Sequence, residues 1–139
     1  MMRVMSFFDV YTDEAVIHSM VFNIVARNQD DHVKNIAFLM DRKGNWSLSP
    51  AFDITYSYNP TGEWTSAHQM TLNGKRDDFR LTDFESCGEV ALMKQGQAKS
   101  IIRDVQEVVS RWREFAEEAG VNSGQREAIQ KTLRLEKLV

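Results

Sequence analysis

The alternation of apolar and polar residues in the first part of the chain predicts one well-buried helix. From Asp13 to Arg27 the pattern is helical: Thr12 can act as the N-cap, acidic residues fill the first turn, and Arg27 lies in the last turn. Apolar residues occur on more than one face of this segment. We therefore expect a helix that is buried on more than one side.

Two short strands are predicted next. The segments NIAFLMD (35–41) and WSLSP (46–50) have the composition of strands, and the glycine-containing segment DRKGN joins them as a hairpin connection. Pro50 would end the second strand because proline has no N–H to pair with a neighbouring strand. Residues 51–79 are rich in turn residues and aromatics but lack a clear period. We expect a long irregular loop there, and such loops are more often functional than idle.

The second half of the chain predicts helices. Thr82 is placed to cap a helix from about Asp83 to Met93, and residues 98–119 carry apolar side chains spaced three and four apart. Gly120 is suited to end that second helix as its C-terminal cap. A last amphipathic stretch covers residues 125–138. The fold class that follows is mainly α with a small β-hairpin.

Length and composition indicate one domain. The 139 residues are enough for a single hydrophobic core and hardly for two, and no repeat or Gly/Ser linker divides them. We expect one domain over residues 1–139, with residues 1–12 as an N-terminal arm. A formal net charge of -3 gives no global attraction to nucleic acid or to an anionic membrane.

The cellular compartment is predicted from the cysteine content and from the lack of membrane and signal-peptide patterns. Cys87 is the one cysteine, so an internal disulfide is excluded, which fits a reducing compartment. We expect Cys87 to be a small buried hydrophobe. No segment approaches the roughly 18 apolar residues of a membrane helix, and the N-terminus lacks a signal-peptide pattern. The expected location is the cytoplasm, with no membrane partner.

The densest polar cluster directly follows the most hydrophobic stretch. Residues 28–35 are NQDDHVKN, after MVFNIVA. Asp30 precedes Asn35 by five positions, and Asp53 follows Asn35 by eighteen, beyond the predicted hairpin. Kinase-type phosphoryl transfer needs these parts in this order. One Asp accepts the proton of the attacking hydroxyl, an Asn five residues later binds magnesium, and an Asp after the hairpin holds magnesium against the nucleotide phosphates.

The neighbouring residues fit the same chemistry. His32 and Lys34 add hydrogen-bond donors or positive charge near the transferred phosphate, where charge develops in the transition state. Oxygen ligands suit Mg²⁺, which keeps several waters and needs few protein groups. The expected cofactors are ATP and Mg²⁺.

A family resemblance accompanies this pattern. In Asp30-x-His32-x-x-Asn35, the histidine replaces the lysine usual in protein kinases, a variant of lipid-kinase-like and HipA-type kinases. Residues 22–57, FNIVARNQDDHVKNIAFLMDRKGNWSLSPAFDITYS, closely resemble the catalytic segment of the HipA family of bacterial serine/threonine kinases, toxins of type II toxin–antitoxin pairs. HQMTLNGKRDDF and RWREFAEEAGV resemble the C-terminal region of that family. The resemblance covers roughly residues 15–121.

The resemblance implies a role for each matching position. Asp30 would be the catalytic base, and His32, Lys34 and Asn35 would lie in the stretch that contacts ATP and magnesium, with Asn35 a metal ligand. Asp53, in AFDI, would be the second metal-binding acid, the counterpart of the Asp-Phe-Gly motif although the glycine is absent. The acid at position 31 receives no chemical role.

The resemblance also implies partners and an architecture. The family's usual partner is a HipB-like helix-turn-helix antitoxin, so contact with nucleic acid would be indirect, and its known targets include glutamyl-tRNA synthetase, an aminoacyl-tRNA synthetase. A complete HipA-like protein is much longer, and its upstream part holds the phosphate-covering loop, the phosphate-binding Lys and the adenine hinge. We therefore expect the C-terminal lobe of a protein-kinase-like fold without its N-terminal lobe, as a truncation, an excised domain or half of a split kinase. Alone it would be nearly inactive, with an exposed apolar patch that favours self-association.

Three alternatives stay open at this point. The charged residues of the cluster are also compatible with a solvated loop. Asp-Asp-His is a plausible metal triplet of a phosphohydrolase, although His18 and His68 lack helix-face spacing to His32. The lobe could instead be a non-catalytic interaction module that binds an antitoxin or a separately encoded N-terminal half. His68 itself receives no role.

Two features of the long loop complete the predictions. The Asn73-Gly74 pair predicts a hairpin turn. Lys75, Arg76 and Arg80 are diluted by neighbouring acids and are expected to form a solvated turn. In the second half, the tryptophan and phenylalanine of SRWREFAEE are expected on a packed helix face.

Overall fold

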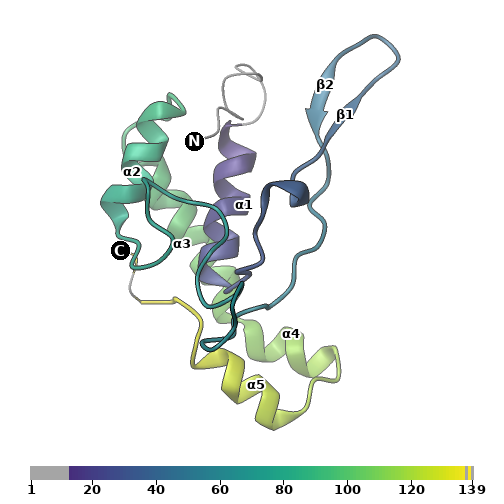
Figure 1. The fold of residues 1–139 in the computed structure, drawn as a ribbon, viewed down its shortest axis with the longest axis vertical. Coiled ribbons are helices and arrows are strands. Elements are labelled where there is room, and N and C mark those ends of the chain that lie inside the picture. Colours follow the sequence, from purple (N-terminus) through teal and green to yellow (C-terminus); the bar gives the residue numbers. More distant parts are fainter. Residues whose placement is uncertain (1–12, 137, 139) are drawn as a thin grey trace.

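The computed structural model describes residues 13–136 and 138, and within them the fold is mainly helical with one two-stranded antiparallel hairpin (Figure 1). The predicted arm over residues 1–12, and with it the Thr12 cap, lies outside the described residues. The elements in chain order are α1 (Asp13–Val25), the 3₁₀ turn η2 (Val33–Asn35), β1 (Phe38–Met40), β2 (Trp46–Leu48), α2 (Leu81–Val90), α3 (Gln97–Ser110), α4 (Trp112–Glu118) and α5 (Ser123–Gln130).

The core forms where α1 packs against α3, and α2 packs against α3 as well (Figure 1). On α1 the fully buried residues recur at helical spacing, as Ile17, Val21 and Ile24, so one apolar stripe faces α3. Met20 and Phe22 on neighbouring positions are partly buried against the same core. The prediction of burial beyond one stripe is confirmed to that extent.

The first helix is shorter than predicted. It ends at Val25, because Arg27 adopts a left-handed backbone with a φ of 61° and turns the chain into the polar cluster. The Arg27 side chain contacts residues outside this helix. Its Nε donates to the carbonyl oxygen of Thr132 at 2.8 Å, and its guanidinium lies 4.1 Å from the centre of the Tyr58 ring.

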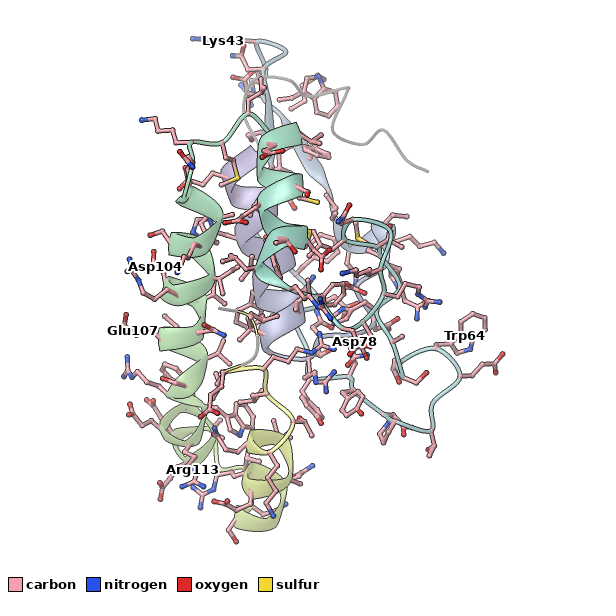
Figure 2. The ribbon with its side chains drawn as sticks, turned by 90° about the vertical axis from the view of Figure 1, so that its left-hand side faces the viewer. Lys43, Trp64, Asp78, Asp104, Glu107 and Arg113 are labelled. Atoms are coloured by element: carbon pink, nitrogen blue, oxygen red, sulfur yellow. The ribbon has the colours of Figure 1, made fainter. Side chains whose placement is uncertain are left out.

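The hairpin is confirmed, with shorter strands than the sequence suggested. Phe38 pairs with Leu48 and Met40 with Trp46, and Asn35 belongs to η2 rather than to the first strand. The Asp41 side chain closes the turn by accepting hydrogen bonds from the backbone of the connecting residues. The hairpin extends away from the helices, with Lys43 at its tip (Figures 1 and 2).

Two helix boundaries in the second half differ from prediction. The single helix over 98–119 is two helices, α3 and α4, because the backbone leaves helical geometry at Arg111. The cap predicted at Thr82 is also wrong, because α2 begins at Leu81. The start of α2 is stabilised by Asp83, whose Oδ2 accepts the Arg80 N–H at 2.8 Å. Gly120 has a φ of 74° and ends α4 as predicted.

The last amphipathic stretch is helical only in its first part. α5 ends at Gln130, and the chain then crosses back towards α1 without regular structure (Figure 1). Leu133 and Leu135 are partly buried against the core and Leu138 is buried. These leucines satisfy a helical spacing, but they are buried by the packing of an irregular segment.

The loop over residues 51–79 is irregular, as predicted, except for one turn. Asn73 and Gly74 both have positive φ values and join Leu72 to Lys75 through paired backbone hydrogen bonds, which confirms the hairpin turn. The solvated turn predicted for the basic residues is wrong in part. Lys75 Nζ lies 2.7 Å from the buried Asp83 carboxylate, and Arg76 donates to the carbonyl oxygen of His68.

Two further predictions of burial are wrong in degree. Cys87 is half-buried, not fully buried. Phe115 is 42% exposed, so it does not lie in a closed core, although Trp112 beside it is partly buried. Among the residues that the structure describes, no helix has both the length and the apolar composition to cross a membrane.

Candidate active site

The first part of the polar cluster after α1 holds three buried side chains. Asn28 and Gln29 are 2% and 0% exposed, and Asp31 is 6% exposed. Asp30 is the accessible member, with a side chain that is 48% exposed. Buried polar side chains are usually hydrogen-bonded inside the protein, so a freely solvated loop does not describe Asn28, Gln29 and Asp31.

Ser57 supplies several of these partners. Its Oγ accepts hydrogen bonds from the backbone N–H groups of Gln29 and Asp30, at 2.8 and 2.9 Å, and donates to Asn28 Oδ1 at 3.3 Å. The Ser57 N–H donates to the carbonyl oxygen of Arg27. One serine from the long loop therefore fixes the backbone that presents Asp30. No sequence pattern marked Ser57, because it lies in a segment without a clear period.

Asn35 and Asp53 meet beside Asp30. Asn35 Nδ2 donates to Asp53 Oδ2 at 2.9 Å and to the Asp30 carbonyl oxygen at 3.1 Å. Asn28 Nδ2 donates to the Asp53 carbonyl oxygen at 3.3 Å. The three residues that the sequence spacing singled out are thus brought to one place.

Asp53 holds an unusual backbone conformation. Its φ of 54° lies in the left-handed region, which few residues other than glycine adopt. Such conformations persist where the surrounding structure enforces them, and they concentrate at functional sites. Here Asn28 donates a hydrogen bond to the Asp53 carbonyl oxygen and Asn35 donates one to the Asp53 carboxylate, so both the backbone and the side chain of Asp53 are held.

The other two predicted residues lie at the edge of the site. His32 is partly exposed, and its Nε2 lies 4.0 Å from Asp30 Oδ1. The opposite ring atom, Nδ1, is buried without a hydrogen-bond partner. Lys34 is exposed on η2. The structure therefore places His32 beside Asp30, and Lys34 lies exposed on the same 3₁₀ turn as Asn35.

These residues fit a magnesium ion. Both hydrogen bonds of Asn35 use its amide nitrogen, which leaves the amide oxygen as the atom that can meet a cation. The Asp53 side chain is exposed beside it. An amide oxygen and a carboxylate are donors that Mg²⁺ accepts, with water completing its octahedron.

Asp31 lies apart from this group. Its Oδ2 lies 2.9 Å from His68 Nδ1, and its Oδ1 accepts the Gln69 N–H at 2.7 Å. Both carboxylate oxygens are therefore engaged inside the protein, which argues against an Asp-Asp-His metal triplet. In the described part of the chain, no three His, Cys, Asp or Glu side chains come together as a metal site.

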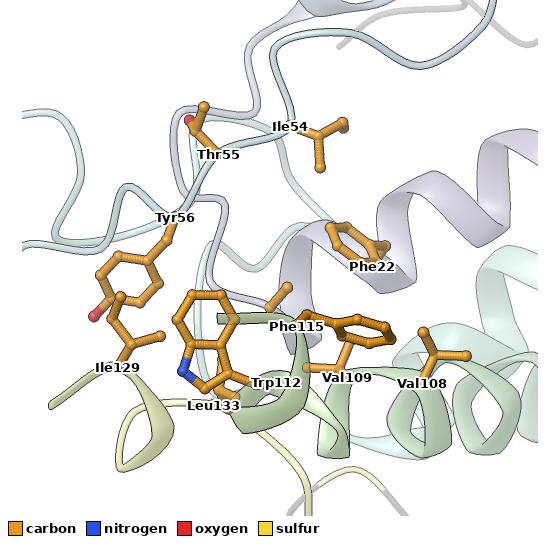
Figure 3. Close-up of a pocket in the computed structure, with 11 residues that line it drawn as sticks. Phe22, Ile54, Thr55, Tyr56, Val108, Val109, Trp112, Phe115, Ile129 and Leu133 are labelled. Atoms are coloured by element: carbon orange, nitrogen blue, oxygen red, sulfur yellow. The ribbon is translucent and has the colours of Figure 1, made fainter. Parts of the chain in front are cut away.

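An apolar pocket of about 200 Å³ lies behind the Asp53 loop (Figure 3). Ile54, Thr55 and Tyr56, which directly follow Asp53, form one wall, and Phe22 of α1 and Trp112 of α4 lie opposite. Tyr56 OH and Thr132 Oγ1 are hydrogen-bonded at 3.1 Å. The Asp53 loop thus rests on α1 and on the C-terminal helices.

Comparison with known proteins gives one informative result. A family model described as the HipA-like C-terminal domain matches residues 2–112. The match includes the polar cluster, the hairpin and the Asp53 loop. A search of curated proteins finds no match to the chain.

Proposed function

The chain belongs to the family of HipA-like C-terminal domains, and from this premise we propose that it is the C-terminal catalytic lobe of a HipA-like serine/threonine protein kinase. The kinase would be the toxin of a toxin–antitoxin pair. The reaction is the transfer of the γ-phosphoryl group of ATP to a protein hydroxyl with magnesium. The activity needs an N-terminal lobe, because positioning of the nucleotide is most of what such an enzyme contributes.

Asp30 is the group that accepts the proton of the attacking hydroxyl. Its side chain is about half exposed, so a substrate serine or threonine can reach it. Its backbone is held by the hydrogen bond to Ser57, so the main chain that carries the carboxylate is already positioned before the reaction. As the hydroxyl proton passes to Asp30, the substrate oxygen bonds to phosphorus and the bond to the β-phosphate oxygen breaks.

Asn35 and Asp53 are the residues that would hold the metal. Magnesium, when bound, neutralises charge on the phosphates. The residues of this chain contribute the amide oxygen of Asn35 and the carboxylate of Asp53, which their hydrogen bond brings together. His32 and Lys34 lie on the same stretch as Asn35 and supply donors towards the phosphate oxygens.

One observation carries this proposal: the amide nitrogen of Asn35 bridges the Asp30 carbonyl oxygen and the Asp53 carboxylate. These positions are the base, the metal-binding amide and the metal-binding acid of a kinase site. Because they are separated in the chain, their convergence supports a shared task in addition to local folding.

Phosphate transfer from labelled ATP tests the proposal. The chain is assayed alone and with an N-terminal lobe of a HipA-like protein supplied in trans, with a bacterial glutamyl-tRNA synthetase and a generic protein as acceptors. We expect transfer only with both lobes, and a loss on the order of a hundredfold or more in Asp30→Asn. Transfer that survives Asp30→Asn would contradict the role of Asp30.

A non-catalytic binding role is the second candidate. Exposed apolar side chains favour it: Leu39 and Met40 on β1 are 54% and 58% exposed, and Leu92 after α2 is 91% exposed. Such surfaces suit a HipB-like antitoxin or a separate N-terminal half. If both lobes associate but Asp30→Asn changes neither binding nor any transfer, the binding role is the better description.

A further inference from the structure

Asp31, next to the proposed base, is fixed by a segment far along the chain. Its carboxylate is buried, with Oδ2 at 2.9 Å from His68 Nδ1. Its other oxygen accepts backbone hydrogen bonds from Gln69 at 2.7 Å and from Met70 at 3.4 Å. Ser57 therefore holds the N–H of Asp30, and the long loop holds the side chain of Asp31, on either side of the peptide that joins the two residues.

His68 is held between two charged partners. Its side chain is 1% exposed, and its Nε2 lies 3.1 Å from Arg134 Nη1. A guanidinium can only donate, so Nε2 must accept, and the ring proton must be on Nδ1, where it is donated to Asp31. The contacts thus assign one neutral tautomer to His68. The negative charge of Asp31 and the positive charge of Arg134 compensate each other across the ring.

Arg134 connects this pair to the end of α1. It is 8% exposed, its backbone N–H donates to the Val25 carbonyl oxygen at 3.0 Å, and its Nη1 lies 3.4 Å from the Ile24 carbonyl oxygen. Its Nη2 donates to Asp77, and the guanidinium lies 5.3 Å from the centre of the Phe79 ring. Arg134 lies beyond residues 2–112, the part that the family model matches.

From this chain of contacts we infer that His68 is a positioning residue of the active site, with Arg134 setting the tautomer in which it donates to Asp31. His68 holds the Asp31 side chain and thereby fixes the peptide whose carbonyl oxygen accepts from Asn35. The functional meaning rests on the proposed kinase function, since it is Asp30 and Asn35 that would be misplaced without His68. The segment after α5 supports the site through Arg134.

Two substitutions of His68 separate positioning from simple packing. In His68→Asn the amide nitrogen can replace Nδ1 and still donate to Asp31. In His68→Gln the longer side chain brings an amide oxygen to the place of Nε2, where it can accept from Arg134 but not hold Asp31. Both remove the buried ring, so both should lower the midpoint of urea unfolding by similar amounts.

The readout is the side-chain amide signal of Asn35 in ¹⁵N NMR spectra of the full chain, together with Mn²⁺ binding. We expect His68→Asn to keep the Asn35 signal near its wild-type position and the Mn²⁺ affinity within about twofold. His68→Gln should shift or broaden that signal and weaken Mn²⁺ binding by about tenfold, the effect typical of lost outer-shell contacts. Equal behaviour of the two variants at similar stability would overturn the positioning role.

The wild-type protein gives a second test that does not depend on any variant folding. Long-range ¹H–¹⁵N spectra should show the His68 proton on Nδ1, and a proton on Nε2 would overturn the assignment. The outcome for the proposed function is separate. If wild-type protein does not bind Mn²⁺ while the Asn35 signal responds as expected, the metal site fails and the positioning of the loop by His68 stands.

Discussion

Asn35 donates its amide hydrogen to the Asp53 carboxylate over 2.9 Å, although eighteen positions and a complete hairpin separate the two residues. The hairpin makes this possible, because antiparallel strands return the chain close to its starting point. η2 before β1 and the loop after β2 therefore lie side by side at the base of the hairpin (Figure 1). The amide and the acid need only short connections to reach each other.

The first prediction concerns this pair. Asp53→Asn removes the charge but keeps a side chain that tolerates the left-handed backbone at this position, where φ is 54°. We expect Mn²⁺ binding to weaken on the order of tenfold or more, because affinity follows the number of charged ligands. Titration followed by the electron paramagnetic resonance of free Mn²⁺ measures it.

Asp104→Asn is the matched control. Asp104 lies on the solvent side of α3, with a side chain that is 59% exposed (Figure 2). The two variants change the net charge equally. Equal Mn²⁺ affinities for both would show that Asp53 is not a ligand.

The sequence predicted the parts of the fold that depend on local pattern. Helix α1, the hairpin and the Gly120 cap follow from periodicity and from turn chemistry within a few residues. The convergence of Asp30, Asn35 and Asp53 was expected from their spacing, and the structure brings them together. The chemical roles assigned to them stay predictions.

The parts that the sequence missed depend on contacts between distant segments. Ser57 and Asp30 are 27 positions apart, and His68 and Arg134 are 66 apart, so no local pattern marks either pair. The leucines after Gln130 have helical spacing, but the burial of an irregular segment satisfies the same pattern. Periodicity reports which side chains are buried, and it does not report which backbone conformation buries them.

The second prediction concerns Ser57. In Ser57→Ala the N–H groups of Gln29 and Asp30 lose their acceptor, and Gln29 is fully buried. An unsatisfied buried donor costs about 1–3 kcal/mol, so we expect the free energy of unfolding to fall by about 2 kcal/mol. Urea denaturation measures it. Ser47→Ala, on the exposed strand β2, is the control and should change the value by less than about 0.5 kcal/mol. Equal losses in the two variants would contradict the structural role of Ser57.

The third prediction concerns acid stability. Burial alone would raise the pKa of Asp83, but hydrogen bonds from Lys75 and Asn73 outweigh it and lower the pKa from 3.8 to about 2. A carboxyl whose pKa is lowered in the folded state stabilises the fold above its unfolded pKa, and this stability is lost as the pH falls towards the folded value. We therefore expect the urea midpoint to fall between pH 4 and pH 2.

Asp83→Asn tests the source of that loss. The variant should be less stable than wild type at pH 6, and its urea midpoint should depend less on pH below 4. Asp104→Asn should keep the wild-type dependence. If Asp83→Asn shows the same acid slope as wild type, another carboxyl is responsible.

The fourth prediction concerns Cys87. Burial raises the pKa of its thiol, so less of the reactive thiolate is present near neutral pH. We expect alkylation by iodoacetamide at pH 8 to be roughly tenfold slower in the native protein than in the same protein unfolded in urea. Mass spectrometry over a time course measures both rates. Equal rates would mean that the thiol is open to solvent.

The last prediction uses two glycines as a pair. Gly120 has a φ of 74°, and a Cβ there would meet no atom within 4 Å, so Gly120→Ala should cost only the left-handed backbone strain, about 1 kcal/mol of unfolding free energy. Gly124 lies in α5, and a Cβ there would make an ordinary contact, 3.5 Å from Asn122 Oδ1. Gly124→Ala should stabilise by about 0.5–1 kcal/mol, because alanine loses less backbone entropy in a helix. Urea denaturation of both variants should give changes of opposite sign in the free energy of unfolding. A decrease in both variants would contradict the helical position of Gly124 in α5.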